Sequence, residues 1–127
     1  MVVVSDTSPL IHLAANKHLY LLHSLYGEIV IPSSVYEELR LKSKNEEIKK
    51  EIFSHEWIKP KSASDRKLVE ELVSRLGGAE SEAIDLAIEL KADLLLIDER
   101  KGRAAAKEFH LRTGGVLSVL IEANAWG

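Results

Sequence analysis

Acidic side chains stand directly after two short apolar runs of this chain. A run of three valines and a serine leads to Asp6, and the apolar run 94–97 leads to Asp98. Each run is typical of a strand that is buried on both faces of a parallel sheet. Because the carboxyl ends of parallel strands meet at one edge, we expect the carboxylates of Asp6 and Asp98 to lie close together.

Further acids occur in two helices that we expect to begin near the same edge. Glu37 and Glu38 follow the second predicted strand, and Glu80 and Glu82 follow a glycine pair. Carboxylates that gather in one place repel one another unless a proton or a cation intervenes. Oxygen donors suit Mg²⁺ or Mn²⁺, which can activate a water molecule and stabilise the charge of a phosphate under attack. The acids therefore indicate a metal-dependent hydrolysis of phosphate esters.

Helical spacing distinguishes the two acids after the glycine pair but does not decide between them. Glu82 shares its spacing with Asp85 and Glu89, which is typical of an acidic stripe facing solvent. Glu80 shares a face with apolar side chains, so periodicity turns Glu80 inward and Glu82 outward. Near a helix start, however, a side chain can reach past the helix end. A turn residue or a helix cap is the alternative interpretation of any one of these acids taken alone.

The elements that must position the acids alternate between strands and helices. Strands are predicted at 1–5, 28–31, 57–59 and 92–97. Helices are predicted from Pro9 after a cap at Ser8, at 18–26, from Pro32 or Ser33 to about Leu41, around 48–53, from a cap at Ser64 or Asp65 to Leu76, at 79–90, at 102–109 and at 115–124. Strands separated by helices imply crossover connections, hence an α/β fold with a mostly parallel sheet.

Composition restricts the class of protein. A length of 127 residues favours one domain over residues 1–127, with 46% hydrophobic and 29% charged residues in an ordinary globular balance. No apolar run reaches the roughly 20 residues of a membrane span, and the start has no signal-peptide pattern. The absence of cysteine excludes disulfides and cysteine-based zinc sites and fits a cytoplasmic location. With a net charge of −3, a nucleic-acid binder needs a local basic patch.

Four segments resemble, in chain order, the PIN-domain family of metal-dependent nucleases, which includes the VapC-type toxins of toxin–antitoxin pairs. The segments are Val3–Ile11, Ile31–Leu39, Glu82–Ala87 and Leu94–Asp98. The resemblance implies a three-layer α/β/α sandwich around a parallel sheet and endonucleolytic RNA cleavage with Mg²⁺ or Mn²⁺. It also implies a homodimer, and an antitoxin that covers the acidic site with a basic side chain.

The same resemblance selects the catalytic and metal-binding acids. In the second segment the family's acid precedes a leucine, which selects Glu38 over Glu37. The third segment begins with the family's acid, which selects Glu82 and leaves Glu80 as the alternative. The full set that the resemblance implies is Asp6, Glu38, Glu82 and Asp98, with Glu99 as the alternative to its neighbour.

Other side chains receive supporting roles. Thr7 or Ser8 is expected to orient Asp6 or to contact a metal-bound water, with a helix cap as the alternative. The basic residues after Asp98 are expected to hold RNA phosphates, with a solvated helix face as the alternative; they are Arg100, Lys101, Arg103 and Lys107. The five histidines show no metal-ligand spacing and are interpreted as structural or surface residues.

Two other functions compete with a nuclease. One is a non-catalytic RNA- or protein-binding module on a PIN scaffold, against which the retention of all four acids argues. The other is a phosphatase with Asp6 as nucleophile. Phosphatases of the haloacid-dehalogenase type carry a second Asp two places after the nucleophile, where this chain has Ser8.

Overall fold

A computed structural model describes residues 1–126, apart from the side chains of Lys42 and Trp126; Gly127, the last residue of the expected domain, lies outside the described residues. Within this part of the chain, five strands form one sheet in the order β3-β2-β1-β4-β5. All four strand pairings are parallel, which confirms the predicted sheet. The strands are β1 (Val3–Ser5), β2 (Ile29–Pro32), β3 (Ile58–Lys61), β4 (Leu94–Leu96) and β5 (Thr113–Gly114).

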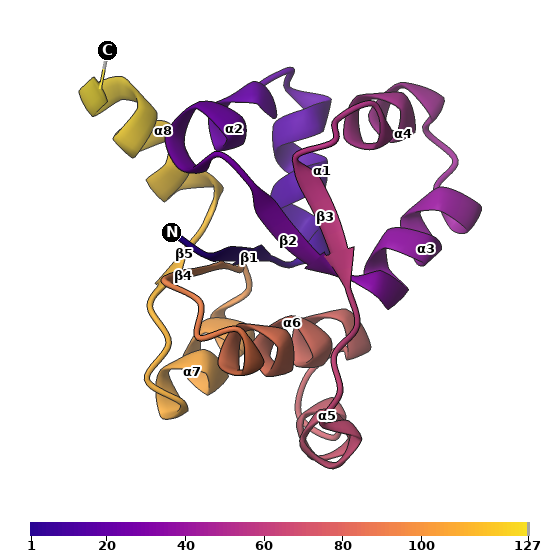
Figure 1. Cartoon of the computed structure of the whole chain (residues 1–127), viewed down its shortest axis with the longest axis vertical. Coiled ribbons are helices and arrows are strands. Elements are labelled where there is room, and N and C mark those ends of the chain that lie inside the picture. The colour runs from indigo at the N-terminus through magenta and orange to yellow at the C-terminus, as the bar shows by residue number, and fades with distance from the viewer. Residues whose placement is uncertain (127) are drawn as a thin grey trace.

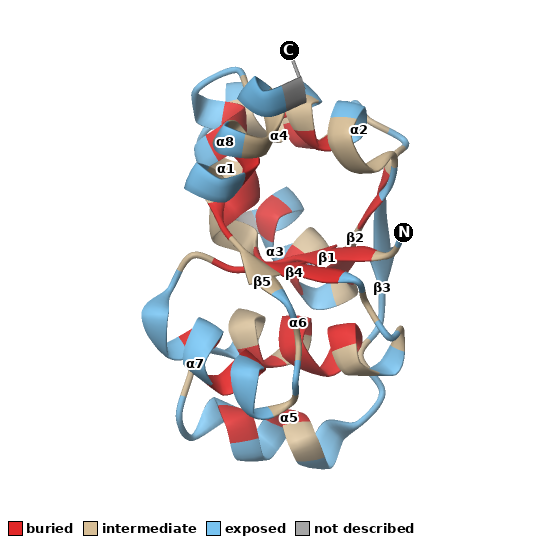
Figure 2. Cartoon of the chain, turned by 90° about the vertical axis from the view of Figure 1, so that its left-hand side faces the viewer, coloured by how far each residue is buried: buried red, intermediate tan, exposed pale blue. Residues whose placement is uncertain are grey.

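Helices cover both faces of the sheet and make three layers (Figure 1). They are α1 (Thr7–Ala15), α2 (Tyr20–Tyr26), α3 (Ser33–Lys42), α4 (Glu46–Phe53), α5 (Arg66–Val73), α6 (Gly78–Glu89), α7 (Arg100–Glu108) and α8 (Val116–Trp126). Helices α1, α2, α4 and α8 lie on one face, and α6 and α7 lie on the other, with α5 on the outer side of α6 (Figure 2). This arrangement confirms the predicted α/β/α sandwich.

Side chains of the central strands alternate between two apolar cores. Val3 packs into the core beneath α1 and α2, whereas Val4 packs into the core against α6, and both are fully buried. The same alternation places Leu96 on the first side and Leu95 on the second. Successive side chains of a strand point to opposite faces, so a central strand covered on both sides must be apolar throughout. The two flanking cores therefore hold β1 and β4 side by side at the centre of the sheet.

Two predicted boundaries are wrong for identifiable reasons. The structure places Pro60 inside β3, although the predicted strand ends at residue 59. Strand β3 is at an edge and pairs only with β2, so a residue without an N–H is tolerated there. Helix α1 starts at Thr7 with Asp6, not Ser8, at the N-cap position, because Asp6 is the last residue in extended conformation.

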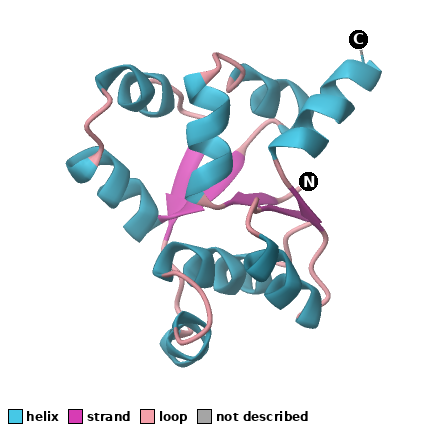
Figure 3. Cartoon of the chain, turned by 180° about the vertical axis from the view of Figure 1, so that it is seen from behind, coloured by secondary structure: helices cyan, strands magenta, loops and turns pink. Residues whose placement is uncertain are grey.

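Strand β5 (Thr113–Gly114) was not predicted, and the other elements agree with the predicted pattern, with short shifts at their ends. Gly27 ends α2 with a φ of +81°, a conformation that glycine adopts without strain. Helix α7 begins at Arg100, two residues before the predicted start. Seen from behind, α1 and α6 lie on opposite sides of the strands (Figure 3). None of the helices in residues 1–126 is long and apolar enough to cross a bilayer.

Candidate active site

The two strand-end acids converge at the carboxyl edge of the sheet. Strands β1 and β4 are neighbours in register, with Ser5 opposite Leu96. The N–H of Asp6 donates to the carbonyl oxygen of Leu96 at 2.9 Å, and Asp98 follows two residues later. An open pocket of about 620 Å³ lies here; it is lined by Asp6, Thr7, Ser8, Ile11, His12, Glu38, Gly77, Gly78, Ala79, Glu80 and Glu99.

Asp6 is the buried centre of this acidic site. Only 3% of the residue is exposed. Burial raises the pKa of Asp6 from 3.8 to about 6, and the charges of Glu80, Glu99 and Asp98 add to the increase, although a backbone hydrogen bond from Thr7 acts against it. We call these four acids the carboxylate cluster.

Three oxygen atoms of the carboxylate cluster are buried without a hydrogen-bond partner among the described residues. They belong to different side chains: Oδ1 of Asp6, Oε2 of Glu80 and Oδ2 of Asp98. Buried polar atoms in native proteins are nearly always hydrogen-bonded, and an exception calls for an explanation such as an ion. Burial, followed by the charge of Glu99, also raises the pKa of Glu80. The cluster therefore needs protons or a cation to balance its charge.

Two helix starts hold the partly buried acids in place. Glu80 lies in the first turn of α6, where the helix dipole tolerates a negative charge. Asp98 Oδ1 accepts a hydrogen bond from the N–H of Val116, the first residue of α8, at 2.9 Å. Gly102 and Gly115 lie directly against Glu80 and Asp98, and a Cβ atom on either glycine would collide with the carboxylate.

The structure places Glu82 outside the acidic pocket, although the family resemblance selects it. Its carboxylate lies 3.3 Å from the guanidinium of Arg66 on α5 and does not line the acidic pocket. Glu80 takes its place in the cluster. Side chains two positions apart on an α-helix point about 200° away from each other, so Glu80 and Glu82 must face different ways. Helical periodicity in the sequence indicates the inward direction of Glu80, whereas the family motif selects Glu82.

The second predicted segment contributes Glu38 to the lining of the pocket. Glu38 is exposed on α3, and its neighbour Glu37 instead pairs with Arg40 at 2.8 Å. Thr7 and Ser8 line the pocket beside Asp6. The basic residues of α7 are exposed but do not line it; they are Arg100, Lys101, Arg103 and Lys107.

His12 is a pocket residue that sequence reasoning missed. Its Nδ1 atom lies 3.4 Å from Oδ2 of Asp98. His12 and Asp98 are far apart in the chain and share no motif, so only the packing of α1 beside the end of β4 brings them together. The interpretation of all five histidines as structural or surface residues is therefore incomplete for this one.

The donor set fits a hydrated divalent cation. Among residues 1–126, no group of three or more His, Asp or Glu side chains is arranged to hold one metal ion. Mg²⁺ usually keeps several water molecules and binds through only one or two carboxylates. The unpartnered oxygens of Asp6, Glu80 and Asp98 supply such donors in a buried, negatively charged position. Both the chemistry and the charge of the site thus suit Mg²⁺ or Mn²⁺.

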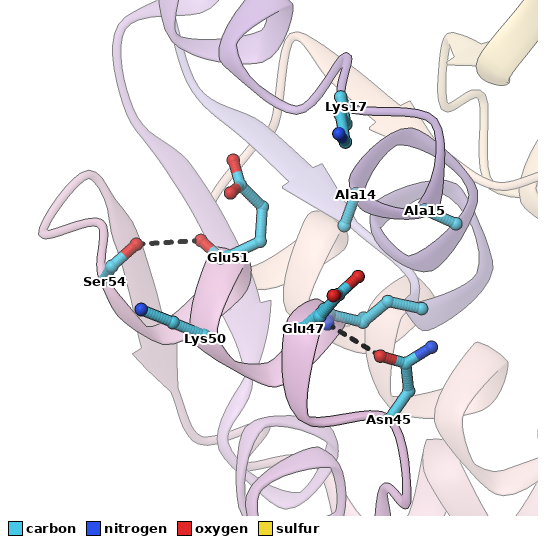
Figure 4. Close-up of a pocket in the computed structure, with 9 residues that line it drawn as sticks. Ala14, Ala15, Lys17, Asn45, Glu47, Lys50, Glu51 and Ser54 are labelled. Carbon is cyan, nitrogen blue, oxygen red and sulfur yellow. Dashed lines mark hydrogen bonds between the residues drawn. The ribbon is translucent and has the colours of Figure 1, made fainter.

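A second pocket, of about 380 Å³, lies between the end of α1 and α4 (Figure 4), and none of the four acids of the cluster lines it. Lys17 faces it from the end of α1, and α4 contributes Glu47, Lys50 and Glu51. Opposite charges are mixed in this pocket, and it contains none of the unpartnered oxygens. We therefore assign the chemistry to the carboxylate cluster.

The fold and the site together define an α/β protein with a carboxylate cluster at the carboxyl edge of a parallel sheet. A family model of the PIN domain matches residues 2–127, and the chain belongs to the PIN-domain family. PIN domains are generally nucleases and typically use divalent metals.

A solved structure supports the same fold. The crystal structure of PAE2754 from Pyrobaculum aerophilum is similar, with a TM-score of 0.67 and 21% sequence identity over 98% of each chain. At this identity the likeness concerns the fold alone. A search of curated proteins found no match.

Proposed function

We propose that this chain is a cytoplasmic, metal-dependent endoribonuclease and the toxin of a toxin–antitoxin pair. The observation that carries the proposal is the set of three buried, unpartnered carboxylate oxygens of the cluster, two of which belong to residues that line the acidic pocket, Asp6 and Glu80. Membership of a family of nucleases supports phosphodiester hydrolysis. The lack of cysteine is consistent with a reducing compartment.

Asp6, Glu80 and Asp98 would hold Mg²⁺ or Mn²⁺. When bound, such an ion lowers the pKa of a water molecule and stabilises negative charge on the phosphate. The chain itself excludes solvent around Asp6 and orients Asp98 through the amide of Val116. Thr7 and Ser8 present hydroxyl groups that can hydrogen-bond a water molecule in the pocket.

Two further acids extend the site toward solvent. Glu38 and Glu99 line the pocket and are exposed at its rim, on α3 and before α7. From this position, Glu38 and Glu99 can contact the metal ion through water molecules or bind a second metal ion. Helix α7 begins one residue after Glu99 and carries its basic side chains on its solvent face. The phosphates of the RNA would bind to this face, since arginine and lysine supply the positive charge that phosphate contacts require.

An antitoxin segment is the proposed protein partner. An apolar pocket of about 430 Å³ adjoins the acidic one and shares Thr7, Ile11, Glu38 and Ala79 with it. A segment with an apolar side chain in this pocket and a basic side chain at the cluster would match both the shape and the charge. Such binding would block the active site.

The chain is also proposed to form a homodimer through helix α8. Leu117 and Ile121 lie one turn apart on α8 and are 71% and 62% exposed. The same face of a second copy could cover them in an isologous contact. Light scattering on the native chain and on the Leu117→Ser, Ile121→Ser variant tests this: the native chain should be dimeric and the variant monomeric.

RNA cleavage tests the proposed activity. The native chain is incubated with end-labelled single-stranded and structured RNAs in Mg²⁺, in Mn²⁺ and in a chelator, beside Asp6→Asn. Cleavage should require the ion and fall at least about 100-fold in the variant. Equal cleavage under all conditions would contradict a metal-carboxylate mechanism, and ion-independent RNA binding without cleavage would favour a binding module.

A further inference from the structure

The imidazole of His12 faces a carboxylate oxygen of the cluster at a distance unusual for a hydrogen bond. Nδ1 of His12 lies 3.4 Å from Oδ2 of Asp98, and this oxygen has no hydrogen-bond partner among the described residues. Hydrogen bonds between nitrogen and oxygen have lengths of roughly 2.7–3.2 Å. The two atoms therefore lie within ion-pair distance but beyond the usual length of a hydrogen bond.

The same distance is the one expected of two donors bound to one metal ion. Nitrogen and oxygen donors bind such ions at roughly 2.0–2.2 Å, so neighbouring donors are roughly 3.0–3.5 Å apart. Asp98 is held in the required orientation, because its other oxygen accepts the hydrogen bond from Val116. The ion pairs found in the described part of the chain give Asp98 no lysine or arginine partner.

The position of His12 also suits a metal ligand. His12 lines the pocket that contains Asp6 and Glu80, and its side chain is 59% exposed, so solvent and ions reach it. Asp6 supplies the buried, unpartnered oxygen at the base of the same pocket. The pocket thus has an oxygen donor from Asp6 and a nitrogen donor from His12, and Oδ2 of Asp98 lies 3.4 Å from that nitrogen although Asp98 itself does not line the pocket.

We propose that His12 Nδ1 and Asp98 Oδ2 bind the same divalent ion, so that the site of this chain prefers Mn²⁺, Co²⁺ or Zn²⁺ to Mg²⁺. This inference rests on the proposed metal-dependent function. Imidazole is a poor ligand for Mg²⁺ but suits transition metals, whereas carboxylates accept both. His12 is then a specificity-determining residue for the metal.

Metal binding in the absence of RNA tests the proposal. Untagged native chain, His12→Gln and His18→Gln are titrated with MnCl₂ and MgCl₂ in a calorimeter, at a pH where imidazole is neutral. The native chain should bind Mn²⁺ at least about tenfold more tightly than Mg²⁺. His12→Gln should lose about tenfold in Mn²⁺ affinity and change within about twofold for Mg²⁺. The control His18→Gln should match the native chain for both ions.

A spectroscopic measurement on the native chain gives an independent result. Nitrogen-15 NMR of the histidine rings is recorded as ZnCl₂ or MgCl₂ is added. Zn²⁺ should shift the Nδ1 signal of His12 before the other histidines, and Mg²⁺ should not. No Zn²⁺ shift at His12, or equal losses of Mn²⁺ and Mg²⁺ affinity in His12→Gln, would overturn the proposal.

The design separates this inference from the proposed function. If native chain and His12→Gln bind both ions with equal affinity while Asp6→Asn binds neither, the metal site stands and the role of His12 is wrong. If the native chain binds no divalent ion, both are wrong.

Discussion

Gly102 lies so close to Glu80 that a Cβ atom at position 102 would be 2.6 Å from the Oε2 atom of Glu80. It would also be 2.5 Å from Cδ1 of Ile97. Both atoms are at the ends of flexible side chains, which can move without unfolding the protein. The glycine therefore lets α7 approach the cluster while the Glu80 carboxylate stays in it.

Gly102→Ala should displace Glu80 and spare the fold. We expect a loss of about 1 kcal/mol in the free energy of unfolding and a loss of about tenfold in Mn²⁺ affinity. Urea unfolding and calorimetry measure the two quantities. Ala104→Ser is the control, because Ala104 is exposed on the same helix and does not line the acidic pocket. Unchanged Mn²⁺ affinity in Gly102→Ala would contradict the positioning of Glu80 by this glycine.

Glutamine substitutions at the two neighbouring acids of α6 should separate their roles. Glu80→Gln removes a charge from the cluster and should lower RNA cleavage at least about 100-fold. Glu82→Gln removes only the pair with Arg66, whose side chain is 60% exposed, and should cost less than about 1 kcal/mol of stability with near-native cleavage. The reverse ranking in a cleavage assay would restore Glu82 to the site.

The charge of Asp6 should destabilise the metal-free chain at neutral pH. Its pKa rises from 3.8 to about 6 on folding, so the folded state binds the proton more tightly than the unfolded state. Stability then falls as the pH rises through this window and stays low above it. Asp6→Asn should be about 2 kcal/mol more stable than the native chain at pH 7.5, with no gain near pH 4. Urea unfolding without metal at both pH values measures this, and a pH-independent difference would refute it.

Asp85 is a buried acid of α6 that lies outside the cluster. Its Oδ2 accepts a hydrogen bond from the N–H of Asp65 at 3.3 Å. Burial, then the charge of Glu89, raises the pKa of Asp85 to about 6. The carboxylate of Glu89 accepts from the N–H of Ser64 at 2.8 Å, so the acid pair holds the segment before α5.

Asp85→Asn should therefore behave as a structural change only. At pH 7.5 we expect it to be about 1 kcal/mol more stable than the native chain, because the charge buried beside Glu89 is gone. This gain should vanish as the pH falls from about 6 to below 4, for the same reason as at Asp6. Cleavage and Mn²⁺ affinity should be native, in contrast to Asp6→Asn. A loss of cleavage would show that this acid serves the site.

Arg103 on the solvent face of α7 should contribute to RNA binding and not to metal binding. Arg103→Ala should weaken RNA binding several-fold and lower the slope of log affinity against log salt by about one. Lys67→Ala is a control on an exposed basic residue of α5. Filter binding at several salt concentrations in a chelator measures the slope. Equal slopes for both variants and the native chain would remove Arg103 from the RNA surface.

Local sequence patterns were enough to predict the central strands, the layered fold and part of the acidic site. Apolar runs that end in an acid predicted both central strands and the convergence of Asp6 and Asp98, because parallel strands share one carboxyl edge. Strands alternating with helices predicted the layered fold, since crossovers leave few other arrangements. Helical periodicity also indicated that Glu80, and not Glu82, turns inward.

Tertiary packing decided the rest of the site. His12 lies beside Asp98 only because α1 packs beside the end of β4, and no local sequence pattern around either residue predicts this contact. The burial that raises the pKa of Asp6 comes from the helices packed on both faces of the sheet, and the fit of Gly102 against Glu80 depends on the approach of two helices. Periodicity tells which way a side chain turns on its own element, but the distance between atoms on different elements depends on how the whole core packs.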